Sequence, residues 1–107
     1  VYHLYLMISI SKSDVTPPKM VSCPPDMIKL AESGTHSTSV TWEEPKYTDT
    51  SGEAVEIVQT EGLSNGERFV EGIHVIQYSA TDSSGNVNTD CIFKLQVKGK
   101  VLGSVYA

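Results

Sequence analysis

The chain has 107 residues, of which 39% are hydrophobic and 20% are charged, and its formal net charge is −5. This length suits one domain that can bury a core of its own. The composition excludes a nucleic-acid partner, because phosphate binding requires a basic patch and Arg68 is the only arginine.

The acidic residues are concentrated in the middle of the chain. Eight acids lie from Glu43 to Glu71, against the two bases Lys46 and Arg68. A solvated acidic face is the simpler interpretation, and a site for a cation or a basic partner is the alternative.

The chain begins with an apolar segment, Val1–Ile10. It is too short to be inserted across a membrane, which takes about 20 residues. Three alternatives stay open: the end of a signal sequence, the end of a neighbouring domain, or a strand. A strand would fit the shared parity of its apolar residues Leu4, Leu6, Ile8 and Ile10.

Cys23 and Cys91 are the only cysteines, and they lie far apart in the sequence. One distant pair cannot supply four metal ligands, so a single disulfide in an oxidising compartment is the simplest interpretation. Closing so long a loop would contribute roughly 4 kcal/mol in the chain-entropy model. The alternative is two unpaired buried thiols in a cytosolic domain.

Apolar residues recur with a period of two along most of the remaining chain, and proline and glycine mark the breaks. Pro17-Pro18 and Pro24-Pro25 precede the first predicted strand, Met27–Ala31. In this strand the alternation predicts that Ile28 and Leu30 face the core.

The second predicted strand, Ser37–Glu43, is rich in β-forming residues and places Val40 and Trp42 on one face. It ends before Pro45, because proline cannot donate a hydrogen bond to a central ladder. The next predicted elements are a strand at Val55–Thr60 and a short one at Phe69–Val70.

Two longer strands have the clearest alternation, Ile73–Asp82 and Cys91–Lys98. Apolar side chains occupy every second position from Ile76 to Ala80 in the first and from Cys91 to Val97 in the second. The side chains predicted to face the core are Ile76, Tyr78 and Ala80 in the first strand, and Cys91, Phe93, Leu95 and Val97 in the second.

No window of helical length has a convincing helical period. Short strands separated by frequent turns predict an all-β fold, either a sandwich or a barrel. A lone tryptophan on an early strand, together with one long-range disulfide, favours the sandwich. The predicted core residues are Val40, Trp42, Ile76, Tyr78 and Phe93.

Short motifs in a characteristic order span most of the chain, from about Pro17 to Lys98. The motifs are Pro17-Pro18, Cys23-Pro24, Val40-Thr41-Trp42-Glu43-Glu44-Pro45, Asp49-Thr50-Ser51-Gly52, Phe69-Val70-Glu71-Gly72, Ile76-Gln77-Tyr78-Ser79-Ala80-Thr81-Asp82-Ser83-Ser84-Gly85-Asn86 and Cys91-Ile92-Phe93. Each motif is weak alone, but together they resemble the hyalin repeat, or HYR, family. Ile76 departs from the family pattern, in which valine is usual.

The resemblance implies an immunoglobulin-like or fibronectin-III-like antiparallel β-sandwich of about seven strands over residues 17–98. Residues 1–16 would be a leader or linker that could add a strand, and residues 99–107 a linker or tail. Such modules occur in secreted or cell-surface mosaic proteins, beside sushi, EGF-like, pentraxin-type or further HYR domains, and are associated with cell adhesion. The expected partner is an extracellular protein or matrix component, which the resemblance does not name.

In such a sandwich Trp42 would fill the space between the two sheets. Tyr78 would anchor its hydroxyl to nearby backbone, as in a tyrosine corner. The disulfide would tie the segment entering the first strand to the last strand, and so close the domain near its termini.

No catalytic site and no cofactor are predicted. His3, His36 and His74 have no metal-binding spacing, and no nucleophile turn is present. We therefore expect this chain not to be an enzyme.

Two acidic loops, Asp49–Glu53 and Asp82–Asn86, could offer oxygen ligands to calcium, which takes about six to eight of them. The candidate ligands are Asp49, Asp82 and Asn86. Capping of the turns by these side chains is the simpler interpretation.

The leading functional hypothesis is a non-catalytic adhesion, protein-interaction or spacer module of a larger extracellular mosaic protein. The second is a calcium- or glycan-binding module that uses the acidic loops and an exposed Tyr47. The third is an accessory domain of a multidomain enzyme.

Overall fold

The computed structural model describes residues 15–99, which form nine β-strands and contain no helix, so the all-β prediction is confirmed. The strands are, in chain order, β1 (Lys19–Ser22), β2 (Met27–Leu30), β3 (Ser37–Ser39), β4 (Lys46–Thr48), β5 (Val55–Glu61), β6 (Arg68–Val70), β7 (Gly72–Asp82), β8 (Val87–Asn88) and β9 (Ile92–Lys98). Segment 1–10, for which a strand was one interpretation, and residues 100–107 of the expected tail lie outside the described residues.

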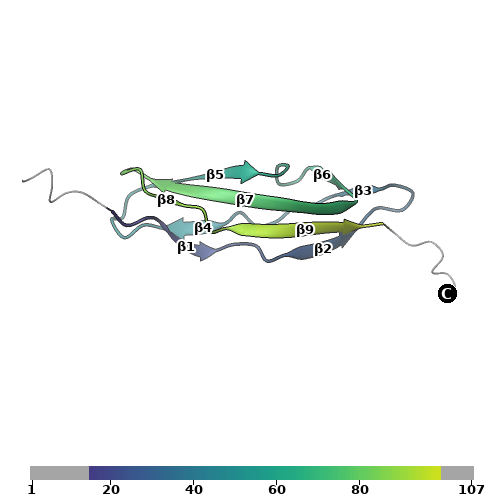
Figure 1. Cartoon of the computed structure of the whole chain (residues 1–107), viewed down its shortest axis with the longest axis horizontal. Coiled ribbons are helices and arrows are strands. Elements are labelled where there is room, and N and C mark those ends of the chain that lie inside the picture. Colours follow the sequence, from purple (N-terminus) through teal and green to yellow (C-terminus); the bar gives the residue numbers. More distant parts are fainter. Residues whose placement is uncertain (1–14, 100–107) are drawn as a thin grey trace, which may run out of the picture.

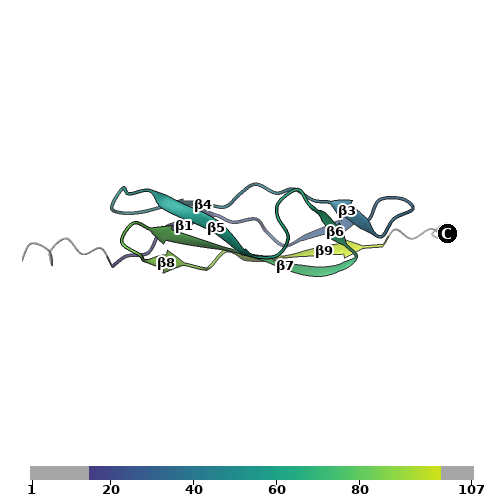
Figure 2. The same ribbon diagram turned by 90° about the horizontal axis from the view of Figure 1, so that it is seen from above.

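The strands form two layers. The larger layer is a five-stranded sheet in the order β2-β9-β7-β5, with β8 paired to β7. Figure 1 views this sheet with β5 at the top, followed downward by β7, β9 and β2. The opposite layer consists of two short ladders, β1–β4 and β3–β6. Figure 2 shows β7 and β8 on one side of the molecule and β3 and β4 on the other.

The pairing is antiparallel throughout the described strands except for β2–β9, which is parallel. The strand count exceeds the expected seven for two reasons. Strands β3 and β4 are pieces of one run, Ser37–Thr48, and β8 has only two residues.

The core lies between the layers and is built mainly from the alternating side chains of β7 and β9. Ile76 and Leu95 are fully buried, and Phe69 of β6 meets them from the opposite layer. The Trp42 ring makes an edge contact with Phe93, with centroids 5.4 Å apart, and a tilted contact with Phe69 at 6.0 Å. The other buried apolar side chains are Ala31, Val40, Tyr78, Ala80, Cys91 and Val97.

Strand β2 faces the other way from the prediction. Ile28 pairs with Gln96 and Leu30 with Lys98, and both partners point away from the core. Ile28 and Leu30 are accordingly 60% and 61% exposed, whereas Ala31 is buried. Alternation along an edge strand fixes which residues share a face but not which face is covered.

The predicted strand Ser37–Glu43 keeps its ladder only to Ser39. Val40 and Trp42 still point into the core, but their backbone groups bond to a turn instead of a strand. The N–H of Gly66 donates to the Val40 carbonyl at 2.8 Å, and the N–H of Trp42 donates to Asn65 Oδ1 at 2.9 Å.

The predicted disulfide is confirmed: Cys23 and Cys91 are bonded, with their Cα atoms 5.6 Å apart. Cys23 lies between β1 and β2, where the chain crosses from one layer to the other, and Cys91 directly precedes β9. The bond therefore ties the segment that enters β2 to the start of β9, the last strand, as expected.

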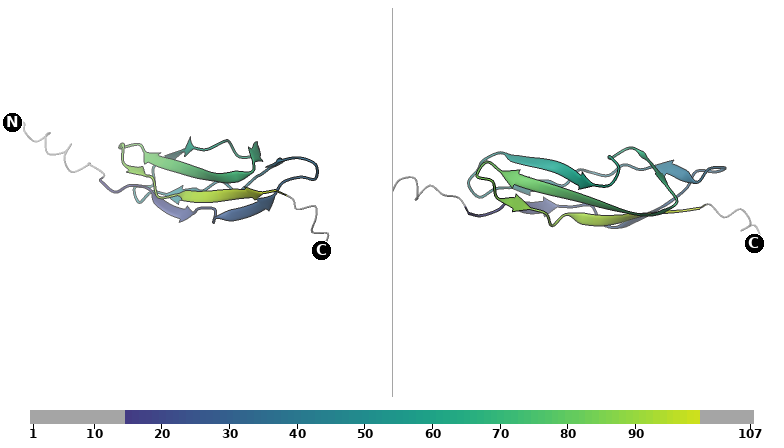
Figure 3. Two further views of the ribbon diagram at one scale, coloured as in Figure 1. Left: turned by 45° about the vertical axis from the view of Figure 1, so that its right-hand side comes forward. Right: turned by 45° about the horizontal axis from the view of Figure 1, so that its top comes forward.

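The described chain enters the sandwich at one end and leaves it after β9 at the opposite end (Figure 3). Between these ends β7 and β9 run side by side along the long direction of the molecule.

Candidate interaction surface

The Asp82–Asn86 loop is closed by the side chain of its first residue. Asp82 Oδ1 accepts hydrogen bonds from the backbone N–H groups of Ser84, at 3.0 Å, and Asn86, at 2.9 Å. Its Oδ2 accepts a hydrogen bond from Asn86 Nδ2 at 3.0 Å. Asp82 is only 4% exposed, and a buried carboxylate needs such partners. Both carboxylate oxygens of this candidate calcium ligand therefore cap the chain's own turn.

The second acidic loop lies beside the first. Ser83 Oγ donates a hydrogen bond to Glu53 Oε1, which joins the Asp82–Asn86 loop to the loop that begins at Asp49. Within that loop, Ser51 Oγ donates to Asp49 Oδ2. In the part of the chain that the structure describes, no group of three or more acidic, histidine or cysteine side chains is placed to hold a metal ion.

Tyr47 is not the exposed aromatic that the sequence suggested. It is half-buried on β4, opposite Met20 of β1, and its Oη is buried without a hydrogen-bond partner among residues 15–99. Burial raises the pKa of Tyr47, and the negative charge of Asp90 raises it further. The hydroxyl that a glycan-binding site would use is therefore turned inward.

Tyr78 and Trp42 form the polar centre of the core. Trp42 Nε1 donates a hydrogen bond to Tyr78 Oη at 2.8 Å. The partner of the tyrosine hydroxyl is thus a side chain, whereas a tyrosine corner would have placed it on the backbone. Burial raises the pKa of Tyr78, the hydrogen bond from Trp42 lowers it, and Glu44 raises it through a hydrogen bond and its negative charge.

Asn65 holds the backbone of Trp42 in place. Its Oδ1 accepts from the Trp42 N–H at 2.9 Å, and its Nδ2 donates to the Trp42 carbonyl at 2.7 Å and to Glu44 Oε2 at 2.8 Å. The sequence marked Asn65-Gly66 only as a turn, because a contact over 23 residues leaves no local pattern.

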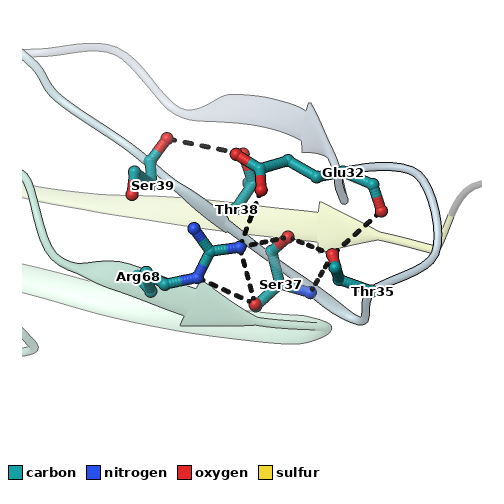
Figure 4. A network of polar contacts seen from close by, with 6 residues as sticks. All are labelled: Glu32, Thr35, Ser37, Thr38, Ser39 and Arg68. Atoms are coloured by element: carbon teal, nitrogen blue, oxygen red, sulfur yellow. Dashed lines mark hydrogen bonds and ion pairs between the residues drawn. The ribbon is translucent and has the colours of Figure 1, made fainter.

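The only arginine, Arg68, is engaged in contacts within the domain although its side chain is about half exposed. Figure 4 shows Arg68 reaching from β6 to the turn between β2 and β3. Its Nη2 donates to Glu32 Oε1 at 2.9 Å, and its Nε and Nη2 both donate to Ser37 Oγ, at 3.2 and 3.1 Å. Both members of the Arg68–Glu32 ion pair are about half exposed, so it contributes little stability and mainly orients the turn.

The two histidines that the structure describes have structural contacts. His36 Nδ1 lies 3.1 Å from Glu71 Oε2. His74 Nε2 lies 2.7 Å from the Val70 carbonyl oxygen, and its ring stands on edge against Phe69 with centroids 5.1 Å apart. His3, the third histidine, lies outside the described residues.

The outer face of the five-stranded sheet, turned away from the core, carries a group of exposed apolar side chains. On β7, Ile73 and Val75 are 63% and 40% exposed. The register places Ile28 beside them, since Ile28 and Ile73 both pair with Gln96. We call this group the outer apolar face; it consists of Ile28, Leu30, Val58, Ile73, Val75, Val87 and Ile92.

These seven side chains are more than half of the twelve exposed large hydrophobic side chains within residues 15–99. Scattered apolar residues are normal on a protein surface, whereas a concentration on one face marks an interaction site. A depression of about 430 Å³ opens on this face, lined by the apolar residues Met27, Ile28 and Ile73 and by the polar residues Asp26, Lys94 and Gln96.

The chain matches a known family over most of its length. A family model described as HYR domain matches residues 13–97. The chain belongs to the HYR domain family. The resemblance inferred from the ordered motifs is thereby confirmed.

Several curated proteins share this domain. The chain is 35% identical over 94 residues to the sushi repeat-containing protein SRPX of Homo sapiens, which covers 88% of the chain and 20% of that protein. It is 37% identical over 90 residues to hyalin of Lytechinus variegatus, covering 84% of the chain and 16% of hyalin. It is 39% identical over 84 residues to the sushi, von Willebrand factor type A, EGF and pentraxin domain-containing protein 1 of Rattus norvegicus. This match covers 78% of the chain and 2% of that protein.

The chain thus spans a fifth or less of the length of these relatives. No solved structure gives a significant match to it. Among residues 15–99 of this HYR domain, the structure has no helix that is long and apolar enough to cross a membrane.

Proposed function

We propose that this HYR domain is a non-catalytic interaction module of an extracellular mosaic protein, and that it binds another protein through its outer apolar face. The observation that carries the proposal is the exposure of Ile28, Leu30 and Ile73 at 60%, 61% and 63% on one side of a sheet whose other side is closed by the core. No part of the described chain covers these side chains. Burying them against a partner would release apolar surface from water.

An extracellular location is supported by the disulfide and by the relatives. Disulfides such as Cys23–Cys91 form and persist in oxidising compartments. The name of SRPX includes sushi repeats, and that of the Rattus norvegicus relative combines sushi, von Willebrand factor type A, EGF and pentraxin domains. We expect neighbouring modules of this kind in the parent protein, and an extracellular protein or matrix component as the partner.

The placement of the chain ends supports a second part of the same role. We propose residues 17–98 as the sandwich, 1–16 as a leader or linker and 99–107 as a linker or tail. Because the described chain enters and leaves at opposite ends (Figure 3), a neighbour on each side would be held apart by the length of the sandwich. The module would then set a distance between its neighbours while leaving the outer apolar face free.

Binding to native extracellular matrix tests this proposal. The fluorescently labelled domain is added to matrix deposited by cultured fibroblasts, and the wild type is compared with Ile73→Lys. We expect saturable binding of the wild type and its loss in the variant, because a lysine at the centre of the apolar face cannot be buried without a partner charge.

Val70→Lys is the matched control. Val70 is 59% exposed, close to the 63% of Ile73, but it lies on β6 in the opposite layer. We expect Val70→Lys to bind as the wild type does. Equal loss in both variants, or saturable binding that neither changes, would show that the outer apolar face is not the binding surface.

A further inference from the structure

The charges on the outer face are ordered strand by strand. The outward side chains of β5 include two acids, Glu56, which pairs with Thr81, and Glu61, which pairs with Gln77. The charged outward side chains of β9 are Lys94 and Lys98. Between them, the outward side chains of β7 are uncharged: Ile73, Val75, Gln77, Ser79 and Thr81. One face thus carries two acids on one side of β7 and two lysines on the other, with uncharged groups between. Asp26, beside Lys94, accepts a hydrogen bond from the backbone N–H of Lys94 at 2.8 Å, and two lysines against this one acid leave the lysine side with a net positive charge.

We infer that the occupant of this face is a second copy of the domain, packed face to face about a two-fold axis parallel to β7. The inference rests on the proposed function and names its partner. A surface that meets an identical surface across a two-fold axis must be complementary to itself. An axis along the uncharged strand β7 satisfies this for its two neighbours, because it places β5 of each copy over β9 of the other. Strand β2, beyond β9, then extends past the β5 edge of the partner and lies outside this contact.

The other symmetric arrangement is unfavourable. A two-fold axis that lies in the plane of the interface but runs across the strands leaves β5 over β5 and β9 over β9. Glu61 would then face Glu61 and Lys94 would face Lys94, and like charges held together at an interface cost free energy. Charge complementarity therefore selects the axis along β7.

The strand register brings one pair of opposite charges to nearly the same level. Glu61 lies level with Gln77 on β7, and Lys94 lies level with Val75, two residues further along the same strand. Two residues of a strand span about 7 Å, and packed sheets are about 10 Å apart. Glutamate and lysine side chains that both extend into this gap can meet, so the dimer would contain two symmetry-related Glu61–Lys94 ion pairs.

The position of Glu61 is fixed by its surroundings. The strand has an irregularity between Gln59 and Glu61, and Gln59 Nε2 donates to the carbonyl oxygens of Glu61, Gly62 and Leu63 at 3.0, 3.1 and 2.7 Å. Gly62 follows with φ of 93°, and a Cβ there would lie 2.8 Å from the Val75 carbonyl oxygen. Glycine at this position lets the end of β5 pass close to β7, beside the apolar centre of the proposed interface.

Charge reversal tests the inference, with sedimentation equilibrium of the purified domain as the measurement. We expect the wild type to form dimers, and Glu61→Lys and Lys94→Glu each to raise the dimer dissociation constant roughly tenfold or more, since each reversal sets like charges together twice. An equimolar mixture of the two variants should dimerise again, because each mixed dimer contains two opposite-charge pairs. The double variant Glu61→Lys/Lys94→Glu should dimerise by itself for the same reason.

Two variants of the same charge change but on the opposite layer serve as controls. Glu67→Lys, directly before β6, and Lys46→Glu, on β4, should leave the dimer dissociation constant unchanged. Thermal unfolding of each variant checks that it is folded. If only one of the interface variants Glu61→Lys and Lys94→Glu folds, its dimer dissociation constant can still be compared with those of the wild type and the controls.

Three results would overturn the inference: a monomeric wild type at millimolar concentration, single variants that dimerise as the wild type does, or single variants whose mixture stays monomeric. A wild type that is monomeric but loses matrix binding through Ile73→Lys would overturn only the identity of the partner. The proposed function fails separately, if matrix binding is insensitive to Ile73→Lys.

Discussion

The two faces of the five-stranded sheet are made by the same strands and by similar residues, yet they have opposite surroundings. On β7, Ile76 is fully buried while Ile73 is 63% exposed. On β9, Phe93 is 1% exposed while its neighbour Ile92 is 53% exposed. The difference is the presence of the β1–β4 and β3–β6 ladders over one face only. Apolar character alone therefore does not place a side chain in the core; the second layer does.

This comparison separates stability from recognition within one sheet. Inward side chains contribute to the free energy of unfolding because the opposite layer removes them from water. Outward side chains contribute little to it and remain available to a partner. Substitutions one residue apart on the same strand should consequently differ in their effect on the free energy of unfolding and on binding to a partner.

The largest effect is expected from the core aromatic of β9. Phe93→Ala should lower the free energy of unfolding by about 3–5 kcal/mol, because it leaves a cavity against Trp42. Ile92→Ala, on the other face of the same strand, should change it by no more than about 0.5 kcal/mol in the monomer. Urea denaturation followed by tryptophan fluorescence measures both. Similar losses for the two variants would break the comparison between the faces.

The disulfide should have an effect of nearly the same size. Replacing Cys23 and Cys91 together by alanine should lower the free energy of unfolding by roughly 4 kcal/mol, because the unfolded chain loses a long closed loop. The outer apolar face is not part of this linkage, so matrix binding of the molecules that remain folded should be unchanged. A double variant as stable as the wild type in guanidinium denaturation would contradict the role assigned to the bond.

A smaller effect is expected from the polar contact inside the core. Tyr78→Phe removes the acceptor of the Trp42 indole N–H and leaves that donor buried without a partner. The free energy of unfolding should fall by about 1–3 kcal/mol. Ser79→Ala, which removes a hydroxyl from the outward side of the same strand, is the control and should be close to neutral. Equal stability of Tyr78→Phe and the wild type would show that the contact contributes nothing.

The smallest effect is a loss of stability in alkali. Burial raises the pKa of both Tyr47 and Tyr78 above the ordinary tyrosine value of 10.0. The folded state then holds these phenolic protons more tightly than the unfolded chain does, so this stability is complete below pH 10. It is lost as the pH rises through the pKa values of the folded state. The urea midpoint should therefore decrease above pH 10; a constant midpoint there would contradict the burial of both hydroxyls.

The strands with the strongest alternation could be predicted from the sequence. From Ile76 to Ala80 in β7 and from Phe93 to Val97 in β9 every second residue is apolar and inward, and the core residues Ile76, Tyr78 and Phe93 follow from that pattern. Strand β2 has apolar residues on both of its faces and lies at the edge of the sheet, and its apolar residues Ile28 and Leu30 point outward. A period of two fixes parity, and only the position of the second layer decides which parity is buried.

The candidate interaction surface was harder to predict from the sequence. Its apolar side chains come from strands that are distant in the chain, and their proximity depends on the parallel pairing of β2 with β9. The opposition of Glu61 and Lys94 across β7 depends in the same way on strand order. The contact of Asn65 with Trp42 is a long-range hydrogen bond between a turn and an interrupted strand, which local propensity does not encode.

The central claim is that the outward face of the β2-β9-β7-β5 sheet associates while its inward face holds the fold. Methyl NMR of isoleucine-labelled protein, recorded as the protein concentration is raised, tests it most directly. We predict that the δ1-methyl signals of Ile73 and Ile92 shift with concentration and that the signal of buried Ile76 stays in place. Signals that are all independent of concentration, or shifts at Ile76 without shifts at Ile73, would contradict the account.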